Sequence, residues 1–100
     1  MKFYILAADG RTPVEVDVLT WGEWFSTADR TLQRTDIRGG IVSTVFLGLD
    51  HNWSLRGAPV LWETMVFADG VDDVASERYR SYEDAAAGHA AMVDRFGGAV

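Results

Sequence analysis

Four side chains in this sequence are of types that could do chemistry: Asp50, His51, Glu63 and His89. Imidazole and carboxylate groups bind zinc and other divalent ions, and they also act as general acids and bases. Asp50 and His51 lie where a predicted strand enters a long loop, a common place for functional groups. Their spacing fits no metal motif, so only the fold could unite them. We expect no metal site and no cofactor, and we keep the four residues as candidates for one catalytic pocket.

His89 and Glu63 also have structural interpretations. His89 lies on the apolar stripe of the predicted last helix, which indicates a buried core histidine that needs a hydrogen-bond partner. Glu63 lies among apolar neighbours and could be that partner. It could instead pair with Arg78 on the next strand.

Two further groups of polar residues are poor candidates for a site. Ser43 and Thr44 lie inside a predicted strand without a nucleophile motif around them. The acidic run at residues 69–77 fails the spacing of a calcium-binding loop, so we expect a solvated loop. An acidic surface that mimics nucleic acid is the alternative, and it would require these carboxylates to form one face with Glu83 and Asp84.

Three residues are predicted to contact a partner. Trp53 and Arg56 lie in the ten-residue segment 50–59, and Trp62 follows it in the next strand. Tryptophan and arginine are enriched at protein–protein interfaces. Trp53 could alternatively close over the core as a lid.

Composition excludes several classes of protein. The chain of 100 residues is 48% hydrophobic, which is typical of a folded domain, and it contains no cysteine. Its formal charge of −6 argues against direct binding of nucleic acid, because phosphates require clustered Lys and Arg. No apolar run is long enough to span a membrane, and no signal peptide is visible. We expect a cytoplasmic protein that is more easily explained as a binding protein than as an enzyme.

The elements that must position these residues can be read from patterning and turn signals. Asp17 or Thr20 could cap the first helix, and Ser81 should cap the last. Gly97 and Gly98 should end the last helix, and we expect residues 97–100 to fray. Gly39 and Gly40 predict a tight hairpin turn. The predicted strands are residues 3–7, 13–16, 31–37, 41–49, 60–67 and 77–80, and the predicted helices are residues 17–30 and 81–96.

This order predicts a single α+β domain over residues 1–100. We expect an antiparallel β-meander sheet of about four to five strands, with both helices packed on one face. The first helix should present Trp21, Trp24 and Phe25 to the core.

The two central strands, residues 41–49 and 60–67, are apolar at almost every position, so both of their faces need a cover. Val42 and Phe46 can meet the helices, which leaves Ile41 and Val45 on the other face. Two short helices cannot wrap both sides of a sheet. A symmetric homodimer is the simplest cover for the second face, and the segment 50–59 is the alternative.

Four stretches of the chain together resemble a family of small uncharacterised proteins encoded by bacteriophages and by bacteria that carry prophages. In one-letter code these stretches are STVFLGLDH from Ser43, WETMVF from Trp62, ERY from Glu77 and AGH from Ala87. The resemblance implies a small protein in the host cytoplasm with no transferable activity, whose partner could be a host or a phage protein. Together with the patterning it predicts an accessory protein that acts as a homodimeric interaction module. The alternative is a small enzyme or ligand-binding domain that uses Asp50, His51, Glu63 and His89.

Overall fold

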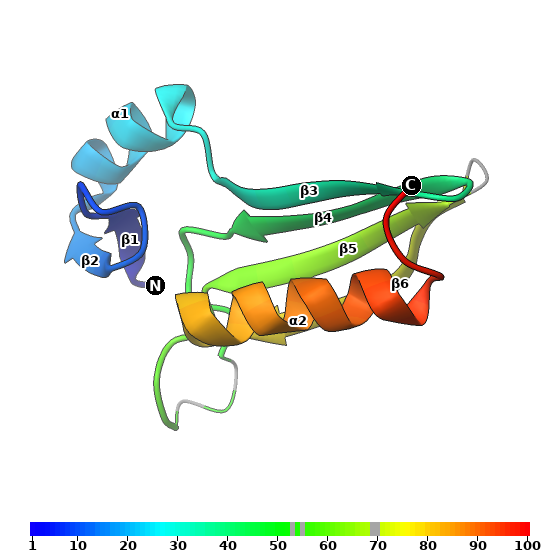
Figure 1. Ribbon diagram of the computed structural model, residues 1–100. Helices are drawn as coiled ribbons and strands as arrows, with labels where there is room; N and C mark the ends of the chain where they lie inside the picture. The colour runs from blue at the N-terminus through cyan, green and yellow to red at the C-terminus, as the bar shows by residue number, and fades with distance from the viewer. Residues whose placement is uncertain (53, 55, 69–70) are drawn as a thin grey trace.

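The computed structural model describes residues 1–100 apart from 53, 55, 69 and 70, and it describes only the backbone of residues 71–73. The described residues form an α+β fold, which confirms the predicted class (Figure 1). Its elements are β1 (Phe3–Leu6), β2 (Pro13–Val16), α1 (Val18–Thr27), β3 (Thr31–Ile37), β4 (Gly40–Phe46), β5 (Trp62–Ala68), β6 (Val71–Tyr79) and α2 (Tyr82–Arg95).

The main sheet is an antiparallel meander in the order β3–β4–β5–β6. Its register places Thr44 opposite Thr64 and Val42 opposite Val66. The β3–β4 turn uses Gly39 at a φ of 78°, a left-handed conformation that favours glycine. A Cβ on Gly40 would overlap the Phe67 carbonyl oxygen. The glycine pair therefore allows both the turn and a close approach of β4 to β5.

The core lies between this sheet and α2, which runs along one face of it (Figure 1). Strand alternation directs Val42, Thr44 and Phe46 toward α2, and all three are fully buried. The helix contributes its own buried stripe of Ala85, His89, Met92 and Val93. The predicted orientation of Val42 and Phe46 toward the helices is confirmed.

Helix α1 and the β1–β2 hairpin form a second layer at one end of the sheet (Figure 1). Asp17 is the N-cap of α1, since its side chain accepts from the Thr20 amide at 2.7 Å. Helix α1 packs on β1, and Trp24 sends its ring edge-on to Phe46 with 5.8 Å between centroids. Both helices thus contribute to the core on the same side of the main sheet.

Most predicted boundaries differ from the structure by a few residues, and three differences are substantial. Strand β4 ends at Phe46 rather than Leu49, shortly before Gly48 adopts a φ of 76° beneath the rings of Trp21 and Phe25. The expected acidic loop is instead the first part of β6, because an edge strand keeps one side in water and tolerates charge.

The third difference is the C-terminal tail, which does not fray. Ala99 forms a bridge with Ile37, and the Val100 amide donates to the Asp36 carbonyl at 3.0 Å. These contacts cover part of the outer edge of β3. No helix among the described residues is long and apolar enough to cross a membrane.

Candidate functional site

His89 lies at the centre of a buried polar network between α2 and the sheet. Its Nε2 atom is 2.8 Å from the Thr35 hydroxyl, and its Nδ1 atom is 2.7 Å from the Thr44 hydroxyl. Thr44 in turn contacts Thr64 Oγ1 at 2.5 Å. The imidazole is only 1% exposed, so the predicted burial is confirmed. The prediction that Glu63 is its partner is wrong, because threonine hydroxyls on β3 and β4 contact both ring nitrogens.

Burial determines the charge state of this imidazole. It lowers the pKa of His89, because the charged form loses solvation that the neutral hydroxyls do not replace. A neutral ring has one donor and one acceptor nitrogen, and two hydroxyls can satisfy both. His89 is therefore a structural residue that fixes α2 on the sheet, without access for a substrate.

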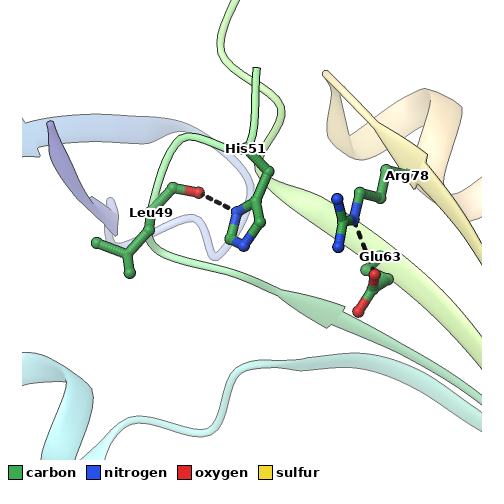
Figure 2. A network of polar contacts seen from close by, with 4 residues as sticks. All are labelled: Leu49, His51, Glu63 and Arg78. Atoms are coloured by element: carbon green, nitrogen blue, oxygen red, sulfur yellow. Dashed lines mark hydrogen bonds and ion pairs between the residues drawn. The ribbon is translucent and has the colours of Figure 1, made fainter. Parts of the chain in front are cut away.

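Glu63 lies on the opposite face of the sheet from His89. Thr64 points into the His89 network, so its neighbour Glu63 points away. Its Oε2 atom accepts from Arg78 Nε at 2.9 Å, and the two residues are register partners across β5 and β6 (Figure 2). The alternative pairing of Glu63 with Arg78 is confirmed. The four candidate residues therefore do not converge on one pocket.

Asp50 and His51 shape the chain where it leaves β4. Asp50 Oδ1 accepts from the Asn52 amide at 2.8 Å and from the Val60 amide at 3.0 Å, which closes the base of the loop. His51 Nδ1 lies 2.8 Å from the Leu49 carbonyl, which can only accept, so Nδ1 carries the proton (Figure 2). Among the residues that the structure describes, no three His, Asp or Glu side chains are grouped so as to hold a metal ion.

The three predicted partner-binding residues differ in where they lie. Trp53 lies outside the described residues. Arg56 is exposed, and its carbonyl accepts from Asn52 Nδ2 and from Arg80 Nη1 at 3.3 Å. Trp62 is 1% exposed and packs on Phe46, with 5.2 Å between ring centroids. As a core residue it presents no surface to a partner, so its assignment as a contact residue was wrong.

Sequence reasoning missed the residues that organise segment 50–59 and the His89 network. Asn52 is buried and also donates to the Ala58 carbonyl at 3.2 Å, and Arg80 Nη1 donates to the same carbonyl at 3.0 Å. Thr35 and Thr64 carry no motif that separates them from other strand threonines. The facing pair Thr44 and Thr64 could have been found only from the register of β4 and β5.

The main sheet also has a second face that α2 does not touch, and we call it the open face. Its members follow from the registers of β3–β4, β4–β5 and β5–β6. They are Arg34, Asp36, Ile41, Ser43, Val45, Glu63, Met65, Phe67, Ser76 and Arg78. No helix among the described residues packs on this face.

The apolar members of the open face form its centre. Ile41 is the register partner of Phe67, Met65 follows two residues along β5, and Val45 lies opposite Glu63. All four apolar side chains are half-buried. The predicted position of Ile41 and Val45 on the second face is confirmed.

Comparison of the chain with protein-family models, with curated proteins and with solved structures found no match. The site must therefore be interpreted from its own geometry.

Proposed function

We propose that this protein is a small interaction module that works as a homodimer through the open face of its sheet. The observation that carries the proposal is the uncovered apolar centre formed by Ile41, Val45, Met65 and Phe67. Fully burying such a side chain stabilises by roughly 1.5–3 kcal/mol, and half-buried side chains retain part of that gain for an interface. A contiguous apolar patch on a small protein commonly marks a surface that binds another protein.

The charges of the open face favour a second copy as its partner. The chain carries a formal charge of −6, so two copies repel each other over most of their surfaces. The open face is different, because Arg34 and Arg78 balance Asp36 and Glu63. A twofold axis would bring one neutral apolar patch onto its copy without concentrating negative charge.

The biological setting in this proposal rests on the sequence resemblance alone. A phage-type accessory protein in the host cytoplasm fits a small acidic chain without cysteine. A host or phage protein would then be the partner that the dimer binds.

The oligomeric state tests the proposal directly. Static light scattering at micromolar concentration should give twice the 11.1 kDa mass of one chain. The variant Ser43→Glu places a carboxylate in the centre of the open face, opposite Arg34 on β3. Within one chain the added carboxylate lies next to Arg34 and should not disturb the fold. In a dimer it would repel the same carboxylate of the second copy across the twofold axis, so this variant should have the mass of a single chain.

Two variants make the result specific to the open face. Gln33→Glu adds the same charge to an exposed position of β3 outside the open face, and it should remain dimeric. Leu19→Glu tests the exposed start of α1, where Leu19 is 78% exposed. A monomeric wild type, or a dimer that only Leu19→Glu dissociates, would overturn the open-face dimer.

A further inference from the structure

A groove runs between the outermost strand β6 and helix α2. It has a cavity volume of about 180 Å³ and is lined by Glu77, Tyr79, Gly88, Ala91, Met92 and Arg95. The last four residues follow helical spacing and form one stripe along α2. We call this feature the β6–α2 groove, and it does not include any member of the open face.

Two small residues of α2, Gly88 and Ala91, border this groove. A Cβ on Gly88 would overlap the ring of Tyr79, so glycine lets that ring lie directly against the helix. Ala91, one turn further, projects only a methyl group. Met92 is 4% exposed and forms an apolar floor. The groove therefore has an apolar centre between β6 and α2, with Glu77 and Arg95 as its charged lining residues.

Among the residues that the structure describes, no strand pairs with the outer edge of β6. Strand β6 ends the strand order of the main sheet, and the Tyr79 carbonyl faces inward, where it accepts from the Leu61 amide at 3.1 Å. Backbone groups of successive residues in an antiparallel strand alternate between its two sides. The amide and carbonyl groups of Ser76 and Arg78 therefore face outward, next to the groove. By contrast, the edge of β3 is partly covered by Ala99 and Val100.

We propose that the edge of β6 binds an extended segment of a partner protein by strand addition. The segment would form backbone hydrogen bonds with Ser76 and Arg78, and its alternate side chains would point toward α2. One apolar side chain would enter the groove and rest on Met92. An edge strand supplies the hydrogen bonds and the groove supplies side-chain selection, which is how strand addition achieves specificity.

The charge of the groove wall defines the partner segment further. Glu77 stands on the groove side of β6, because its register partner Thr64 faces α2. Arg95 also lines the groove, further along α2, where its Nη1 atom is 4.0 Å from the Met92 sulfur and its guanidinium is 5.4 Å from the Phe96 ring centroid. A basic side chain opposite Glu77 would form a cross-strand ion pair, and the chain charge of −6 would attract it. The partner segment is thus extended and carries an apolar and a basic residue two positions apart, so that both face α2.

A displayed library of random linear peptides, panned against the full chain, tests this proposal. Selected peptides should place an apolar and a basic residue two positions apart. The best peptide, synthesised with a fluorescent label, should lose at least roughly tenfold in affinity against Ala91→Trp, which fills the groove. Ala90→Trp is the matched control, because this neighbouring exposed alanine does not line the groove.

A second variant addresses the strand edge without changing the groove. Ser76→Pro removes an outward-facing N–H and leaves the β5–β6 ladder intact, so it should also weaken binding by at least roughly tenfold. The monomeric Ser43→Glu variant should bind the peptide as the wild type does, which separates this site from the proposed dimer. Failure to select any peptide, or selected peptides insensitive to both Ala91→Trp and Ser76→Pro, would overturn the proposal.

Discussion

The imidazole of His89 is held by the hydroxyl groups of Thr35 and Thr44, and no carboxylate among the described residues is bonded to it to stabilise a positive charge. Protonation would therefore place an uncompensated cation beneath α2. This one residue couples the stability of the whole core to pH.

We expect the protein to lose stability as the pH falls below about 6.5, the ordinary pKa of histidine. The folded-state pKa of His89 is lowered, so the unfolded chain binds the proton more readily. The stabilisation is fully present above the unfolded pKa and is lost as the pH falls toward the folded pKa. Thermal melts between about pH 8 and 5 measure this slope.

The variant His89→Gln should flatten that slope. Equal slopes in His89→Gln and the wild type would assign the pH dependence to other groups. Asp9 does not interfere in this range, because bonds from Thr12 and the Arg11 amide lower its pKa to about 2.

Thr44 is the second residue on which the network depends. Thr44→Val keeps the shape of the side chain but removes the hydroxyl that contacts both His89 and Thr64. We expect a loss of about 1–3 kcal/mol in the free energy of unfolding, since two buried polar groups lose a partner. Urea denaturation measures it, with Ser43→Ala as the control on the opposite face. That control should change stability by at most roughly 0.5 kcal/mol, and an equally small effect of Thr44→Val would contradict the network.

The local signals for several elements were strong enough to predict from sequence. Strands β2 and β3 have the predicted bounds. Pro13 restricts the backbone at the start of β2, and Gly39 forms the turn that follows β3. Strand β6 was mostly missed, since its acidic residues are typical of a loop. Its strand conformation comes from pairing with β5, a tertiary effect that local sequence does not contain.

The two helix caps give a prediction at this scale. Asp17→Ala and Ser81→Ala should each lower the free energy of unfolding by about 1 kcal/mol, because a helix amide loses its acceptor. Asp17→Asn is the matched control and should be close to neutral, since asparagine caps helices as well as aspartate does. Chemical denaturation distinguishes these outcomes, and a loss in Asp17→Asn equal to that in Asp17→Ala would show that the cap is not the cause.

At the scale of the whole molecule, the sequence predicted that the two faces of the sheet are covered differently. It did not predict that Trp62 lies in the core or that Glu63 and His89 lie on opposite faces. The alternation along β4 was sufficient to orient Val42 and Ile41. Trp62 was misjudged because a tryptophan in the sequence looks the same in a core and in an interface. The separation of Glu63 from His89 required the register of β5, which only long-range pairing defines.

The balance between net charge and the open face leads to the last prediction. Two chains of charge −6 repel each other at a distance, whereas the proposed interface contains two arginines and two carboxylates per copy. Salt screens the long-range repulsion within a Debye length of about 10 Å at 0.1 M, and it leaves apolar contacts almost unchanged. The dimer should therefore become tighter as sodium chloride rises from about 0.02 to 0.2 M.

Sedimentation equilibrium at several protein concentrations measures this change in the dissociation constant. The control variant Gln33→Glu adds one negative charge per chain outside the interface, so its dimer should depend on salt more steeply than the wild type. If the dimer instead weakens with salt, ion pairs rather than the apolar centre of Ile41, Val45, Met65 and Phe67 hold the two copies together. That outcome would contradict the proposed mode of association, because attraction between opposite charges would then dominate over repulsion between two acidic chains.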